Sequence, residues 1–159
     1  MHLILVTAKA MSTALASLAR NAPAPYAVPM SFARLTPASI HPPFANYAHG
    51  VAVPAHTRLV FCSGQLGIAL DAHVPEDAGA QADLCFAAIA AILAEAGMRL
   101  ADVIRLNAYV SARDYLPAYM ASRDKNMGGA LAASTLMIVS GFAREIFKVE
   151  IEAVAGRKD

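Results

Sequence analysis

Charged side chains are scarce in this sequence. Aspartate, glutamate, lysine and arginine make up 16% of its 159 residues, and the formal net charge is +1. A nucleic-acid-binding domain instead gathers lysine and arginine into a basic patch that neutralises phosphates. The composition therefore argues against nucleic acid as the principal partner.

Long apolar runs are also missing. The longest uninterrupted run, residues 84–94, is much shorter than the roughly 18–20 residues that span a bilayer, so we expect no membrane partner. Nevertheless, 57% of the residues are hydrophobic and the mean hydropathy is +0.46, which is very apolar for a small domain. These values favour a single domain whose surface is partly covered by other copies of the chain, that is, an oligomer.

Cysteine is rare, with two residues that form no CxxC pair. Cys62 falls in an apolar strand segment and Cys85 on the apolar side of a helical segment, so we interpret both as buried thiols in a reducing compartment, the cytoplasm. A disulfide between them stays open at this stage. The five histidines show neither HxH nor HExxH spacing, which gives no support for a metal site.

Residues 1–31 differ from the rest of the chain. Residues 1–20 are rich in alanine and serine, and residues 21–25 resemble a linker, so we assign 1–31 as an N-terminal extension and 32–159 as the domain. A signal peptide is one alternative, but no basic residue precedes its apolar segment and Lys9 interrupts it. Another is that translation begins at Met11 or Met30, of which we favour Met30.

Regular patterning starts at residue 47. Residues 47–53 and 58–63 are expected to be two strands of a hairpin, joined by a turn at 54–57 and ending at Gly64. Residues 77–95 have helical periodicity, and Gly97 is placed to end that helix.

The next segments alternate in type. Residues 103–111 are expected to be a strand with Arg105, Asn107 and Tyr109 on its polar face. Asp114 is then expected to cap a second helix over residues 115–127.

The last quarter of the chain carries the strongest chemical signal. Residues 133–140 and 146–155 are expected to be paired strands, the first apolar almost throughout. In the second, Phe147, Val149 and Ile151 alternate with charged residues, so Glu150 and Glu152 share one polar face. That face could simply be solvated. A carboxylate beside an apolar surface is, however, a candidate general acid or base.

The expected order is β-β-α-β-α-β-β, an α+β fold. Right-handed crossovers place both helices on one face of a mixed sheet. The other face then needs cover from further copies, and a ligand pocket between subunits follows naturally.

Four segments of the chain carry a recognisable pattern. They are Leu59-Val60-Phe61-Cys62-Ser63-Gly64-Gln65, Ala94-Glu95-Ala96-Gly97, the Asp102-Val103 turn with the strand after it, and Val149-Glu150-Ile151-Glu152-Ala153-Val154-Ala155. In this order they resemble the RidA (YjgF/YER057c/UK114) family of reactive-intermediate deaminases. The resemblance spans about residues 46–155. It implies a chorismate-mutase-like fold and a homotrimer with clefts between subunits. It also implies hydrolysis of enamines or imines, such as 2-aminoacrylate and its imine tautomer, to a 2-keto acid and ammonia without a cofactor.

The resemblance also implies site residues. Glu150 is the carboxylate that orients the attacking water, and one such group can serve both proton transfers. The substrate-binding positions are Tyr47, Ser63, Gly64, Tyr119, Ser134 and Thr135. Tyr119 stands where many members carry a polar amide residue, and His49 where a glutamine is usual, although either residue can equally be ordinary packing.

One position departs from the family pattern. Deaminating members carry an arginine that grips the substrate carboxylate where this chain has Ala133. Its loss should weaken binding of a 2-imino acid by about tenfold to over a hundredfold. Other cations, Arg105, Arg123, Lys125 and Arg144, are interpreted as solvated surface charges.

Two function classes follow from these residues. The first is a hydrolase for enamines, imines or related C–N compounds that lack the usual carboxylate, which retention of Glu150 favours. The second is a non-catalytic small-molecule-binding protein, which loss of the arginine favours. Nuclease activity is the least supported, because no basic patch is apparent.

Overall fold

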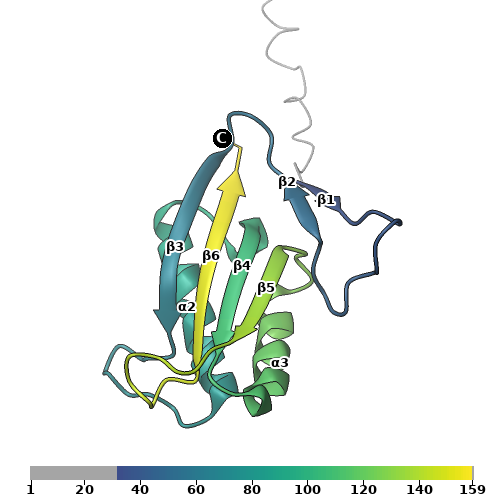
Figure 1. The fold of residues 1–159 in the computed structure, drawn as a ribbon. Coiled ribbons are helices and arrows are strands. Elements are labelled where there is room, and N and C mark those ends of the chain that lie inside the picture. Colours follow the sequence, from purple (N-terminus) through teal and green to yellow (C-terminus); the bar gives the residue numbers. More distant parts are fainter. Residues whose placement is uncertain (1–31, 159) are drawn as a thin grey trace, which may run out of the picture. The chain divides into compact units, whose positions relative to one another are not determined.

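The computed structural model describes residues 32–158, and the expectations for residues 1–31 lie outside this range. Its main sheet has four strands in the order β3-β6-β4-β5 (Figure 1). Their bounds are β3 Arg58–Leu66, β4 Val103–Val110, β5 Ala133–Ile138 and β6 Val149–Arg157. The β4–β5 pair is parallel and the other pairs are antiparallel, so the sheet is mixed, as expected.

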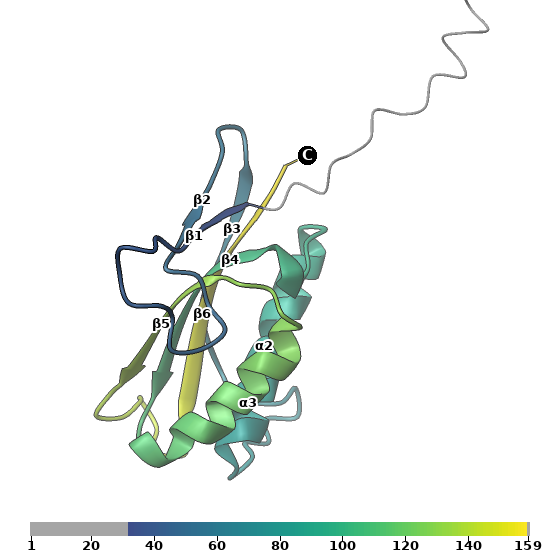
Figure 2. The ribbon, with the colours of Figure 1, turned by 90° about the vertical axis from the view of Figure 1, so that its right-hand side faces the viewer.

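Two helices, α2 (Ala78–Glu95) and α3 (Leu116–Met127), pack on one side of this sheet, which Figure 2 shows edge-on. The Asp77 carboxylate caps α2 by accepting the Ala80 N–H at 2.7 Å. The Asp83 carboxylate on α2 accepts hydrogen bonds from Ser122 and Lys125 on α3, which joins the two helices. The predicted α+β architecture with both helices on one face is confirmed.

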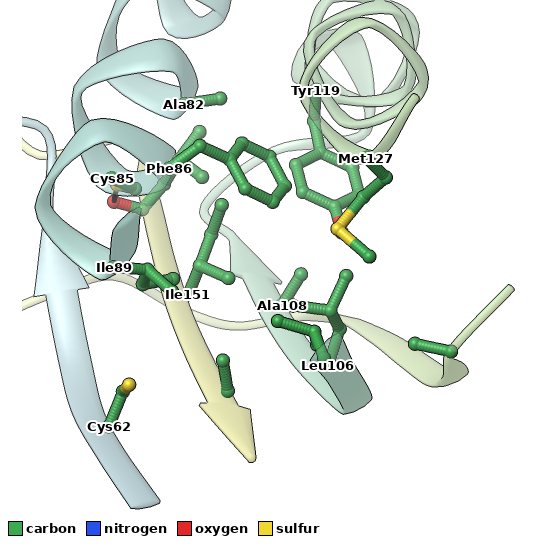
Figure 3. Packing of buried hydrophobic residues seen from close by; sticks show 14 of the residues in the cluster. Cys62, Ala82, Cys85, Phe86, Ile89, Leu106, Ala108, Tyr119, Met127 and Ile151 are labelled. Atoms are coloured by element: carbon green, nitrogen blue, oxygen red, sulfur yellow. Dashed lines mark hydrogen bonds between the residues drawn. The ribbon is translucent and has the colours of Figure 1, made fainter. Parts of the chain in front are cut away.

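The core lies between these helices and the sheet (Figure 3). In the described part of the chain, α2 alone is long and apolar enough to cross a membrane, by length and composition only. Its Phe86, Ile89 and Leu93 are instead fully buried against the sheet, so α2 is the core helix of the domain. Cys62 and Cys85 lie in the same core as free thiols.

Strand β6 runs through the centre of the sheet and shows the predicted alternation. Val149, Ile151, Ala153 and Ala155 are buried on the helix side, whereas Glu150 and Glu152 are only half-buried. We call the side of the sheet that α2 and α3 leave uncovered the open face. Both glutamates lie on it.

The expected hairpin was wrong. Strand β2 (Gly50–Ala52) pairs with β1 (Ala33–Leu35), and β3 pairs with β6. The nine-residue β6 offers β3 a far longer ladder than the three-residue β2. Strand β3 also does not stop at Gly64 but continues through a β-bulge to Leu66.

Two further expectations were also wrong. The last two strands are not partners, because the β4-α3-β5 crossover places β5 parallel to β4, so that β4 separates β5 from β6. Asp114 does not cap α3: it lies in a 3-10 turn, Arg113–Tyr115, that leads into the helix.

Candidate functional site

The open face carries three rows of side chains that the strand register aligns across β6, β4 and β5. The first row is Glu150, Tyr109 and Met137, the second is Glu152, Asn107 and Thr135, and the third is Val154, Arg105 and Ala133. Neighbouring strands lie about 4.8 Å apart, and successive rows about 7 Å apart. Most of the polar groups of this face therefore lie within one small area.

Glu150 packs against the backbone of β3. A Cβ atom added at Gly64 would lie 1.8 Å from the Glu150 Oε1 and 2.8 Å from its Cδ, so the carboxylate occupies the space that any other residue at position 64 would fill. The register passes from Cys62 to Gln65 across this point, and the bulge takes Ser63 and Gly64 out of the regular ladder. The Gln65 side-chain amide donates to the Ser63 carbonyl at 2.9 Å, which steadies the bulge.

A hydrogen-bonded network joins the residues of the second row to Arg105 in the third row and Tyr109 in the first row. The Arg105 Nη2 donates to the Thr135 Oγ1 at 2.6 Å, and its Nε donates to the Asn107 Oδ1 at 2.9 Å. The Asn107 amide and the Tyr109 hydroxyl both donate to the Glu152 Oε2 at 3.1 Å. Desolvation, and then the bond to Glu152, raise the pKa of Tyr109, so this hydroxyl stays protonated and remains a donor.

The sequence-predicted site residues do not all lie on one face of the sheet. Glu150, Ser63, Gly64 and Thr135 come together on the open face. Ser134 is in register with the buried Leu106, so its side chain belongs to the helix side of the sheet.

Tyr47 lies at the start of β5. Its neighbour Ala48 forms a bridge with Ala133, and the Ala48 N–H donates to the Ala132 carbonyl at 3.0 Å. The Tyr47 and His49 rings meet edge to face at 5.7 Å, and the His49 Nε2 lies 2.8 Å from the His41 carbonyl oxygen. Both rings therefore stand at the β5 edge of the sheet.

Tyr119 lies on α3 within the core and is 1% exposed (Figure 3). Burial raises its pKa to about 12, and its hydroxyl has no hydrogen-bond partner among the described residues. The sheet separates Tyr119 from Glu150, so its position favours packing over contact with the same ligand.

The four alternative cations occupy different environments. Arg123 is 5% exposed and bonds to Asp124 at 2.6 Å, so it is not a solvated surface charge. Lys125 pairs with Asp83, and Arg144 lies over the Phe147 ring. Arg105 alone of the four lies on the open face, next to Ala133.

Asn107, Tyr109 and Glu152 were not predicted from the sequence to belong to the site. The alternation of residues 103–111 had already placed Asn107 and Tyr109 on a polar strand face, and Glu152 shares its face with Glu150. What was missing was the pairing of β4 with β6, which puts the two polar faces side by side. Within residues 32–158, no group of three or more histidine, cysteine, aspartate or glutamate side chains is arranged to hold a metal ion.

This chain is similar to a known protein family and to several solved structures. The model of the family described as Endoribonuclease L-PSP matches residues 38–156. Among curated proteins, none matches this sequence. Among solved structures, YyfB of the Rid family from Yersinia pestis is 27% identical with a TM-score of 0.71, covering 79% of this chain and 98% of that one.

Two further structures are similar. RidA from the Antarctic bacterium Psychrobacter is 27% identical, with a TM-score of 0.58 and coverage of 71% of this chain and 89% of its own. Escherichia coli TdcF, solved with bound serine, is 22% identical with a TM-score of 0.59, covering 72% of this chain and 96% of that chain, which shows a common fold.

Proposed function

This chain belongs to the Endoribonuclease L-PSP family, the Rid (YjgF/YER057c/UK114) proteins, and from that premise we propose that it is a hydrolytic deaminase of enamines or imines whose site is the open face. The observation that carries the proposal is the position of Glu150. Its carboxylate is held over the Gly64 bulge on the one side of the sheet that the helices leave uncovered. A small molecule that settles on this face meets a carboxylate whose position is fixed by the backbone beside it.

Glu150 has the chemistry that the reaction needs. It orients a water molecule and accepts its proton as the water oxygen bonds to the imine carbon. That proton passes to the nitrogen, which gives a carbinolamine. Glu150 then transfers the proton of the new hydroxyl group to the nitrogen as the C–N bond breaks, so a carbonyl compound and ammonia leave. No electrons are exchanged, so the reaction calls for no cofactor.

We further propose that copies of the chain cover the open face as a homotrimer with clefts between subunits. Large apolar side chains support this, since Phe61 is 73% exposed, Met137 47% and Leu59 40% on that face. Isolated apolar residues are common on protein surfaces, but several on one sheet face indicate an interface. Native mass spectrometry tests the trimer, and a monomer at micromolar concentration would contradict it. With its free cysteines, such a protein would belong in the cytoplasm.

The test is ammonia release from 2-iminobutyrate generated in situ, and from a neutral imine, with the wild type and Glu150→Gln. Glu145→Gln is the matched control, because Glu145 is exposed in the loop before β6. We expect the Glu150 variant to lose at least about a hundredfold in rate, the low end of the contribution of a positioned general base, and the control to keep wild-type activity.

A non-catalytic small-molecule-binding protein is the second candidate, and Ala133 is the observation that favours it. Binding of small carbonyl compounds together with no ammonia release from either protein would support this alternative. Ribonuclease activity, which the family description names, receives no support from the open face, because Glu150 and Glu152 would repel a phosphate backbone there.

A further inference from the structure

The two glutamates of the open face are directed to opposite sides of β6. Glu150 lies against Gly64 of β3, where its carboxylate occupies the space that a Cβ atom would fill. Glu152 accepts hydrogen bonds from Asn107 and Tyr109, both on β4 and both at 3.1 Å. Strand β6 lies between β3 and β4, so the two carboxylates are held in different places and can have different tasks.

Tyr109 connects the rows of these two carboxylates. It is directly in register with Glu150, and its hydroxyl reaches the next row, where it donates its only proton to the Glu152 Oε2. A tyrosine oxygen can also accept a hydrogen bond. Among residues 32–158, no group donates one to Tyr109. Donation to a carboxylate increases the negative charge on the hydroxyl oxygen, so this oxygen is a strong acceptor for an N–H group of a ligand.

We propose that the Tyr109 oxygen accepts an N–H of the substrate nitrogen, and that Glu152, acting through Tyr109, stabilises the positive charge that this nitrogen gains as it is protonated. This inference rests on the function proposed above. It makes Tyr109 a catalytic residue and Glu152 a positioning residue. The substrates that it favours are primary imines and enamines, whose nitrogen carries a hydrogen atom to donate, over enamines with a dialkylated nitrogen.

The spacing of the strands supports this assignment. The Glu150 carboxylate lies over β3, and the Tyr109 hydroxyl lies at the Glu152 row between β6 and β4. The two groups are therefore one row and one to one and a half strands apart, which corresponds to about 8–10 Å. Two hydrogen bonds of about 2.8 Å, an attack distance of about 3 Å and one C–N bond follow a bent path of that length. Water and hydroxyl thus meet the substrate from opposite sides.

The charges around Tyr109 favour a cation at this place. Strand β6 contributes Glu150 and Glu152, β4 contributes Arg105, and Met137, the neighbour of Tyr109 on β5, is uncharged. The Arg105 guanidinium is directed toward β5, away from β6. The two negative charges that argue against a phosphate backbone on this face therefore favour a protonated nitrogen beside Tyr109.

The first measurement is binding of sec-butylammonium, a stable cation with the carbon skeleton of the imine of butanone, by isothermal titration calorimetry at pH 7. The proteins are the wild type, Tyr109→Phe, Glu152→Gln and two controls outside the sheet, Tyr115→Phe and Glu145→Gln. We expect Kd to rise about tenfold to a hundredfold in Tyr109→Phe, about tenfold in Glu152→Gln, and not at all in the controls. Butanone, which has no charge and no N–H, should bind the wild type and Tyr109→Phe equally.

The second measurement is the pH dependence of kcat for the unsubstituted imine of butanone, generated in situ from sec-butylamine by an amine oxidase. Because the Glu152 charge favours the protonated nitrogen, its removal lowers the pKa of the bound nitrogen. The fall of kcat at high pH should then move to lower pH by about one unit in Glu152→Gln, and in the same direction in Tyr109→Phe. A hydroxyl that only joins β4 to β6 would affect thermal stability and leave this pH profile unchanged.

If Glu152→Gln does not fold, Tyr109→Phe keeps the test valid, because it retains the ring and removes one oxygen atom. Unchanged binding of sec-butylammonium in both variants, or none to the wild type, would overturn the inference. Glu150-dependent hydrolysis with an unchanged pH profile in Tyr109→Phe would leave the proposed function standing and reject this role of Tyr109. Tyr109-dependent binding without hydrolysis would support the nitrogen site and reject the hydrolase.

Discussion

Replacing Gly64 with alanine tests whether the bulge positions the Glu150 carboxylate. The added Cβ would lie 1.8 Å from the Glu150 Oε1, so this oxygen must move by at least about 1.5 Å to reach ordinary contact distance. Gly64 has no positive φ, so alanine can adopt its backbone conformation, and the clash is with the end of a flexible side chain. We therefore expect the fold to survive and the carboxylate to shift.

The expected loss of activity is large, because misplacing a catalytic group by about 1 Å can cost about a hundredfold in rate. The assay is ammonia release from 2-iminobutyrate, with thermal unfolding measured in parallel. Gly50→Ala is the matched control, since its Cβ would meet the Leu35 Cβ at an ordinary 3.6 Å. Wild-type kcat in Gly64→Ala, with a crystal structure showing a displaced Glu150, would refute the positioning argument.

Three further predictions concern the core and its helix. Tyr119→Phe should raise the free energy of unfolding by about 1–3 kcal/mol, because it removes a buried hydroxyl without a partner. The pKa of Tyr119 is raised in the folded state, so the wild type keeps its full free energy of unfolding below pH 10 and loses part of it as the pH rises to about 12. Denaturant titrations across this range should show a smaller fall in the free energy of unfolding for Tyr119→Phe than for the wild type. Burial, and to a lesser extent the Glu150 charge, raise the pKa of Cys85 to about 12, so iodoacetamide at pH 8 should label this thiol only after unfolding, and rapid native labelling would contradict its burial. Asp77→Ala should cost about 0.5–2 kcal/mol in urea unfolding through loss of the α2 cap, and an unchanged midpoint would refute that role.

Features encoded locally could be predicted from the sequence. The alternation around Glu150 gave the faces of β6, and Asp77 with Gly97 gave the ends of α2, because each signal depends on residues close together in the chain. Strand partners could not be predicted in the same way. The true partner of β3 lies about ninety residues away, and its choice depends on the competing ladder lengths.

The same limit applies to the candidate site. The resemblance supplied Glu150 and Gly64, but the sequence could not show that the carboxylate fills the space above that glycine. Nor could it show that Arg105 donates a hydrogen bond to Thr135, thirty residues further along the chain. Tyr119 shows the converse, because a match in position along a helix does not reveal which side of the sheet that position faces.

The most direct test of the central claim is ammonia release from 2-iminobutyrate by the wild type, Glu150→Gln and Glu145→Gln under identical conditions. We predict that the wild type and the Glu145 variant release ammonia, and that the Glu150 variant releases it at least about a hundredfold more slowly. Equal release by all three proteins would contradict the claim that Glu150 on the open face performs the chemistry.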